Sequence, residues 1–149
     1  MTVPTSKDRA FAIELPVWQA PNDNVRITLE RDDVRAEFPT WTKNANYSKY
    51  IGILDFSNVW ALRLERNKHL HYYENREDDE FKSSYWVIPE SSWLEGLTKE
   101  RDITSPNWRA YDKNKYTHYI IQSHDYYIEI IAGDVRFSKR IGRSNDDSK

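Results

Sequence analysis

The sequence predicts an α+β fold that is rich in strands: a twisted antiparallel sheet of about six to eight strands, with one short helix packed on one face. Apolar and polar residues alternate over most of the chain, which is the period of a strand with one wet face. A helical period stands out at one place, after Pro89. The chain holds 6 Trp, 10 Tyr and 5 Phe, enough for an aromatic core although 31% of its residues are charged.

Length and composition predict one domain over residues 1–149. No Ser- or Pro-rich linker divides the chain, and the polar ends, at about 1–7 and 142–149, are expected to be mobile. The absence of cysteine excludes disulfide scaffolds, thiolate zinc sites and iron–sulfur clusters. The chain has no apolar run of roughly 18–20 residues and no apolar stretch behind its charged N-terminus, which predicts a cytoplasmic protein without membrane anchor or signal peptide.

The chain up to residue 88 is predicted to form most of the strands. The runs on either side of Arg31-Asp32-Asp33 form a hairpin. Ser57-Asn58 is a turn or a bulge between two longer extended runs. Pro16 marks a strand end or the edge of the sheet. The predicted strands of this part are residues 11–17, 25–29, 34–38, 50–56, 59–65, 69–73 and 85–88.

Two strands near the C-terminus carry the strongest pattern. Residues 117–123 and 126–132 join at His124-Asp125, a connection of hairpin length. Isoleucines fall on both faces of this pair, so we expect it in the centre of the sheet. Gly133-Asp134 is predicted to be a turn, followed by a last short strand at 135–137.

The helix is predicted from Pro89 to about Glu100, because proline suits the first turn of a helix. Trp93, Leu94 and Leu97 share one face of this helix. These three side chains are expected to pack the helix on the sheet.

His69-Leu70-His71 is the pattern closest to a metal site. On a strand, residues i and i+2 point to the same face, so both imidazoles reach one ion. A catalytic zinc needs about three protein ligands, and no pattern selects a third from His118, His124 or the carboxylates. We therefore expect no metal and no cofactor. Ser123-His124-Asp125 is interpreted as turn chemistry rather than a catalytic triad, because neighbouring side chains on a strand diverge.

Glu129 and Asp55 each lie inside an apolar run. An inward-facing Glu129 is expected to have a raised pKa, because burial disfavours its charged form. With Asp55 it then forms an acid pair for general acid–base chemistry. The alternative is that each carboxyl faces solvent or pairs with Arg63, Lys139 or Arg140.

The chain holds more aromatic and acidic residues than a core can bury, and this surplus predicts a binding surface. Residues 102–115 form a long ordered loop anchored by Trp108, and loops of this length are often functional. The acidic patch at 74–80 suits a basic protein partner, and exposed aromatic side chains anchor such contacts. The predicted binding residues are Tyr72, Tyr73, Glu74, Glu77, Asp78, Asp79, Glu80, Trp108, Tyr111 and His124.

Nucleic acid is the less favoured partner. The net charge is -2 and the pI about 6.1, whereas proteins that bind duplexes are usually basic. One alternative is a protein that binds single-stranded nucleic acid through Arg136, Lys139 and Arg140 together with the tyrosines. A small-ligand-binding or metal-assisted enzyme that uses His69 and His71 is the other.

Two motifs stand out in the C-terminal half of the chain. The first is Tyr85-Trp86-Val87-Ile88-Pro89-Glu90-Ser91-Ser92-Trp93-Leu94, and the second combines His118-Tyr119-Ile120-Ile121, His124-Asp125 and Glu129-Ile130-Ile131-Ala132. They resemble small uncharacterised bacterial proteins, some of which are similar to immunity proteins of toxin–immunity systems. The shared motifs are structural, so the resemblance assigns no functional residue. It favours a non-enzymatic protein-binding domain, and more narrowly an immunity protein that neutralises a toxin, with a basic toxin domain as partner.

Overall fold

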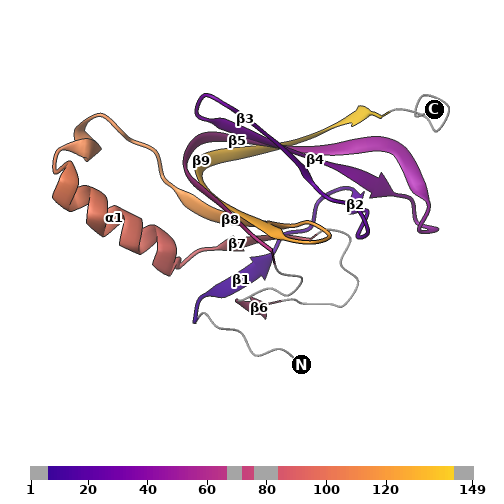
Figure 1. Ribbon diagram of the computed structural model, residues 1–149, viewed down its shortest axis with the longest axis horizontal. Coiled ribbons are helices and arrows are strands. Elements are labelled where there is room, and N and C mark those ends of the chain that lie inside the picture. Colours follow the sequence, from indigo (N-terminus) through magenta and orange to yellow (C-terminus); the bar gives the residue numbers. More distant parts are fainter. Residues whose placement is uncertain (1–6, 67–71, 76–83, 143–149) are drawn as a thin grey trace.

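The alternating pattern folds into one twisted sheet, as the sequence predicts (Figure 1). The computed structural model describes residues 7–66, 72–75 and 84–142. Within them a nine-stranded sheet runs in the order β2-β4-β5-β9-β8-β7-β1-β6, and β3 also pairs with β4. Only the β1–β6 pair of these strands is parallel. The strands are β1 (Arg9–Ala12), β2 (Trp18–Gln19), β3 (Arg26–Glu30), β4 (Asp33–Trp41), β5 (Tyr47–Glu65), β6 (Tyr73–Asn75), β7 (Tyr85–Ile88), β8 (Thr117–Gln122) and β9 (Tyr127–Ile141).

The α+β, strand-rich class is confirmed. Both predicted hairpins form: β3 and β4 meet at Arg31-Asp32, where Arg31 has a φ of 55°, and β8 and β9 join through residues 123–126. β8 and β9 lie inside the sheet, between β7 and β5, which confirms their predicted central position.

The longest pairing joins β5, with 19 residues, to β9, with 15. The turn predicted at Gly133-Asp134 is wrong, because the chain runs through it as strand and Asp134 pairs opposite Ser57 of β5. The short strand predicted at 135–137 is therefore part of β9.

A bulge bends β5 near its middle. Asn58 has a φ of 53°, in the left-handed region that asparagine tolerates better than most residues. The register shifts between Val59 and Ala61, which leaves Trp60 as the inserted residue. Of the two interpretations of Ser57-Asn58, the bulge is confirmed. Figure 1 shows the sheet curving at this part of β5 and β9.

Two predicted strands differ from the structure in length or place. In place of the strand predicted at 11–17, β1 starts at Arg9 and ends at Ala12, although the Ile13 N–H still donates to the Tyr85 carbonyl at 2.8 Å. Pro16 lies beyond the strand, where its missing backbone N–H interrupts no ladder. The strand predicted at 69–73 lies mostly outside the described residues, and β6 starts at Tyr73. Of the ends expected to be mobile, residues 1–6 and 143–149 lie outside as well.

The curved sheet encloses the main core. Side chains of β4 and of the first part of β5 face those of β7, β8 and the first part of β9. A smaller core lies on the opposite face of β7 and β8, because neighbouring residues on a strand point to opposite faces. Residues of the main core include Val34, Ala36, Phe38, Leu54, Phe56, Tyr85, Tyr119, Ile121, Ile128, Ile130 and Ala132; the smaller core holds Ala10, Tyr72, Trp86, Ile88, Ile120 and Tyr127.

The helix α1 (Ser92–Thr104) starts and ends later than predicted. Ser91 caps it: the Leu94 backbone N–H donates to Ser91 Oγ at 3.0 Å, which satisfies a donor that has no partner within the helix. Pro89 therefore lies in a turn before the cap. The predicted loop at 102–115 is shorter than expected, because it begins after Thr104 and contains the short helix η1 (Trp108–Ala110).

The helix projects from the end of β7 to one side of the sheet (Figure 1). None of its residues is fully buried, including the predicted packing residues Leu94 and Leu97. Its N-terminal turn contacts the sheet through Trp93, whose ring lies 5.1 Å from that of His118 in β8. The Arg63 guanidinium of β5 lies 3.9 Å from the Trp93 ring centroid.

Two glycines, one in the main core and one on the exposed helix, allow a matched test of the described structure. A Cβ on Gly52 of β5 would lie 2.3 Å from the ring of Phe38, which is 1% exposed, whereas a Cβ on Gly96 of α1 meets nothing within 4 Å. We expect Gly52→Ala to lower the free energy of unfolding by about 1–3 kcal/mol through overpacking. Gly96→Ala should raise it by about 0.5–1 kcal/mol, because alanine has the higher helix propensity. Urea unfolding measures both, and a Gly52→Ala protein as stable as wild type would contradict the described core.

Candidate functional site

Glu129 lies at the centre of a buried polar cluster formed with Arg63, Tyr72, Ser91 and His118. Its side chain faces inward and the residue is 1% exposed. Arg63 Nε donates to Oε2 at 2.7 Å and Arg63 Nη2 donates to Oε1 at 3.2 Å. His118 Nε2 lies 2.8 Å from Oε1, and the Tyr72 hydroxyl donates to the same oxygen. The pairing of Glu129 with Arg63, one of the alternatives that the sequence left open, is confirmed.

Strand register brings this polar cluster together. Glu129 pairs opposite Arg63 of β5 on one side and opposite Ile120 of β8 on the other. His118 is two residues before Ile120 and therefore points to the same face of the sheet. Ser91, the cap of α1, adds its Oγ 2.7 Å from His118 Nδ1. The polar cluster thus ties the N-terminus of the helix to the centre of the sheet.

The predicted rise in the pKa of Glu129 is wrong. Burial does act to raise it, but the hydrogen bonds from His118, Arg63 and Tyr72 outweigh burial and lower the pKa of Glu129 to about 2. Burial and the hydrogen bond to this carboxylate raise the pKa of Tyr72 above the usual range. Glu129 is therefore ionised at neutral pH and cannot donate a proton there.

The predicted acid pair of Glu129 with Asp55 is wrong as well. Asp55 accepts from Arg35 Nε of β4 at 2.8 Å. The β5–β9 register places Asp55 opposite Arg136, on the other side of the bulge from Glu129. The two carboxyls therefore belong to different parts of the sheet.

Ser91, His118 and Glu129 follow the order of a Ser–His–acid relay. Ionised Glu129 can only accept, so His118 Nε2–H is assigned as the donor to it, and Nδ1 of a neutral imidazole then accepts from the Ser91 hydroxyl, which itself accepts from the Leu94 N–H. However, Ser91 is only 7% exposed and His118 is fully buried. The polar cluster therefore lies inside the structure, where it holds the start of the helix to the sheet.

A second cluster, which we term the aromatic brace, fixes the far end of α1 to the sheet. It consists of Trp60, Arg101, Trp108, Asp112 and Tyr116. The Arg101 guanidinium lies 4.4 Å from the Trp108 ring and 5.0 Å from the Trp60 ring, and its Nη1 donates to Asp112 at 2.8 Å. The ring of Trp60, the bulge residue of β5, lies 4.9 Å from that of Tyr116. Trp108 is buried and anchors the loop, as predicted.

Charge strengthens the aromatic brace at Asp112. Burial acts against the charged carboxylate, but hydrogen bonds from Tyr116, from Asn114 and from Arg101 hold the pKa of Asp112 well below its usual range. The carboxylate therefore stays ionised opposite Arg101 across the physiological pH range.

The aromatic brace supports two exposed apolar side chains. Ile103, in the last turn of α1, is 80% exposed and Tyr111, just after η1, is 69% exposed. Both belong to the segment 92–111, which holds α1 and η1 and which Figure 1 shows projecting from the sheet. We term this segment the α1–η1 projection. Tyr111 is one of the predicted binding residues.

The predicted binding residues do not form one surface in the structure. Tyr72 and Trp108 are buried, so neither presents its ring to a partner. Tyr111 precedes β8 and His124 follows it, so these two exposed residues lie toward opposite ends of that strand. Glu74 is exposed in β6, where Tyr73 also lies. The other predicted residues, Glu77, Asp78, Asp79 and Glu80, and the histidines His69 and His71, lie outside the described residues.

The turn interpretation of Ser123-His124-Asp125 is confirmed. The Val25 backbone N–H donates to Ser123 Oγ at 2.8 Å, and this hydroxyl donates to Asn24 Oδ1 at 2.8 Å. Asn24 Nδ2 donates in turn to Asp125 at 3.3 Å. These bonds tie the β8–β9 turn to the segment before β3.

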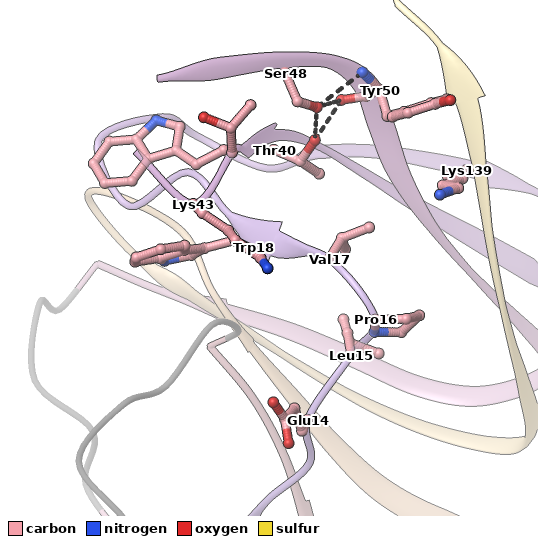
Figure 2. Close-up of a pocket in the computed structure, with 12 residues that line it drawn as sticks. Glu14, Leu15, Pro16, Val17, Trp18, Thr40, Lys43, Ser48, Tyr50 and Lys139 are labelled. Carbon is pink, nitrogen blue, oxygen red and sulfur yellow. Dashed lines mark hydrogen bonds between the residues drawn. The ribbon is translucent and has the colours of Figure 1, made fainter. Parts of the chain in front are cut away.

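A cavity of about 660 Å³ opens at the other end of the sheet (Figure 2). Aromatic rings line it: Trp18 of β2 and Trp41 of β4 form a cross-strand pair with ring centroids 6.1 Å apart, and Tyr50 of β5 forms a further part of the wall. Lys43 and Lys139 also line it. The sequence indicates Lys139 as a partner for carboxylates or nucleic acid, and no pattern in it predicts this cavity.

The sequence does not bring Glu129 together with Arg63, Ser91 and His118 as one site. It offers Arg63 only as one possible partner for Glu129. A serine just before a helical period is a signal for the cap. No comparable local signal marks Trp18, Trp41 and Lys43, which approach one another through pairing of distant strands and the turn after β4.

Within the described parts of the chain, no group of three His, Cys, Asp or Glu residues is placed to hold a metal ion. No helix among the described residues has the length and apolar character needed to cross a membrane. Comparison with known proteins gives no relative: no family model, no curated protein and no solved structure matches the chain.

The charge on Glu129 is expected to make stability depend on pH. The unfolded carboxyl takes up a proton near pH 4.3, whereas the folded one has a pKa of about 2, so the unfolded state binds more protons between these values. This contribution is complete above about pH 5 and is lost as the pH falls toward about 2. Glu129→Gln should cost about 2–4 kcal/mol at pH 7, because it leaves the partly exposed Arg63 without its carboxylate.

Urea unfolding at about pH 7, 4 and 3 checks this dependence, with the exposed Glu95→Gln variant as control. The difference between wild type and Glu129→Gln should shrink as the pH falls, and the control should follow wild type. A difference that stays constant with pH would contradict an ionised Glu129.

Proposed function

We propose that this protein is a non-enzymatic protein-binding domain whose contact surface is the tip of the α1–η1 projection. One observation carries the proposal: Ile103 and Tyr111 expose 80% and 69% of their area on a segment that the aromatic brace fixes to the sheet. Aromatic side chains with few rotatable bonds are common anchors in protein interfaces.

The aromatic brace favours binding because it orders the projection in advance. Association costs free energy when loops and side chains must be ordered, and a surface that is already fixed avoids part of that cost. Trp108 Nε1 donates to Asp102 at 2.8 Å, and the Asp112 N–H donates to the Trp108 carbonyl at 2.9 Å, so both ends of η1 are held. Tyr111 is thereby presented from a fixed backbone.

The non-enzymatic part of the proposal is supported by the buried polar cluster. Ser91 and His118 are closed to solvent, and Glu129 is held ionised by its partners. These groups stabilise the fold, and the exposed residues of the projection remain for a partner.

The finer proposal, that the protein is a cytoplasmic immunity protein for a toxin, rests on the resemblance of its C-terminal motifs. A basic toxin domain would be attracted by acidic residues, of which Glu74 is exposed in β6. The single-strand nucleic-acid alternative is less favoured, because Arg140 pairs with Glu37 at 2.9 Å and Arg136 lies opposite Asp55.

Substitution of the two exposed anchors tests the proposal. Ile103→Ala and Tyr111→Ala should each weaken binding of the toxin that the protein is proposed to neutralise by about 10- to 100-fold, since a contact at the centre of an interface contributes on the order of 1–3 kcal/mol. Both should unfold at the wild-type temperature. Co-purification, calorimetry and protection of cells that express the toxin measure the effect.

Leu29→Ala is the matched control, because Leu29 is an apolar residue of β3 that is 62% exposed and belongs neither to α1 nor to η1 nor to the aromatic brace. It should bind and protect like wild type. If the wild-type protein binds no toxin and protects no cell, protein binding of this kind is excluded; if both anchor variants bind like wild type, the projection is not the contact surface.

A further inference from the structure

The cavity in Figure 2 combines an apolar wall with positive charge at its rim. The segment 14–18 runs along one side of it, and Leu15, Pro16 and Val17 give that side its apolar character. The indole rings of Trp18 and Trp41 meet at 61° beside this segment, in the edge-on arrangement that aromatic pairs prefer. Flat aromatic groups pack well against such walls.

The cavity is held in shape by hydrogen bonds on its polar side. Thr40 Oγ1 donates to the Tyr50 carbonyl at 2.7 Å, and the Tyr50 N–H donates to Ser48 Oγ at 3.0 Å (Figure 2). The first bond joins the end of β4 to the start of β5, and the second fixes the Ser48 side chain within β5. A volume of about 660 Å³ falls within the range of preformed small-molecule sites.

Two lysines at the cavity have no carboxylate partner among the described residues. Lys43, in the turn after β4, and Lys139, in β9, are both exposed, and neither forms an ion pair with any described residue. Lys139 Nζ lies 4.4 Å and Lys49 Nζ 5.3 Å from the Tyr50 ring centroid, so this ring holds two ammonium groups near the cavity wall. Among the described residues of the lining, Glu14 is the one that is acidic. The site is thus locally positive in a chain whose net charge is -2.

A small molecule fits this cavity better than a peptide strand. A peptide that adds to a sheet needs a free strand edge for its backbone. The outer edge of β4 is already occupied, because β2 pairs with Thr40 and Trp41, the Ala20 N–H donates to the Pro39 carbonyl, and β3 pairs with the first part of the strand.

We propose that this cavity binds a small aromatic carboxylate, whose ring packs against Trp18 and Trp41 and whose carboxylate pairs with Lys43 and Lys139. This site is separate from the α1–η1 projection and does not rest on the proposed protein-binding function. A charge-assisted hydrogen bond is stronger than a neutral one, so the carboxylate is expected to improve affinity by about tenfold or more over a neutral analogue.

Indole-3-acetate and its neutral analogue tryptophol are the probes, titrated into the full-length protein by calorimetry. Indole-3-acetate should bind about tenfold more tightly than tryptophol at low salt, and the difference should decrease as salt screens the lysines. Lys139→Gln and Lys43→Gln should each reduce the affinity for indole-3-acetate and leave that for tryptophol unchanged. Trp18→Ala should weaken both probes.

Lys99→Gln is the matched control, because Lys99 lies on α1 and pairs there with Glu95. It should leave both affinities unchanged. Equal binding of the two probes, no saturable binding of indole-3-acetate up to about 10 mM, or unchanged affinity in both pocket-lysine variants would each overturn the proposal. So would a tripeptide Gly-Gly-Trp with a free carboxylate that binds where indole-3-acetate does not, since the occupant is then a peptide terminus.

Discussion

The pairing of β5 with β9 is the constraint on which the other parts of the structure depend. It runs from Tyr50 opposite Ile141 to Glu65 opposite Tyr127, and each strand also pairs with a further neighbour, β4 or β8. A flat ladder of this length would leave the main core open on one side. The bulge at Trp60 bends the ladder, so that side chains of its two halves face each other across a shared interior.

The same pairing places the charged Glu129 inside the structure, where it needs a partner of opposite charge. Glu129 would be costly inside the sheet if it had no partner, and the register supplies Arg63 directly opposite it. His118 and Tyr72 complete the hydrogen bonds to the Glu129 carboxylate. His118 also forms a hydrogen bond with Ser91, the residue that caps α1. A helix without a buried residue is therefore held at its N-terminus by the polar cluster and at its far end by the aromatic brace.

The two proposed binding places lie at different positions along this ladder. Tyr50 and Lys139 belong to the cavity, close to the pair Tyr50–Ile141, whereas Trp60 supports the projection from the bulge. One place offers a concave aromatic wall with Lys43 and Lys139 beside it, and the other a convex tip with Ile103 and Tyr111 exposed. Concave and convex surfaces recognise different partners, a small anion in the first case and a protein surface in the second.

The sequence by itself determined the strand-rich class, both hairpins and the central position of β8 and β9, because alternation with period two is a local property of the chain. It left the orientation of Glu129 open, and the structure turns this side chain inward. Tertiary structure decided what local patterns could not. Gly133-Asp134 has the composition of a turn, yet pairing with Ser57 keeps it in a strand. Burial alone predicts a raised pKa for Glu129, yet partners from three other segments lower it. Trp18 meets Trp41, and Arg101 meets Trp60, only after distant strands have paired, so both proposed sites depend on contacts that no spacing in the sequence encodes.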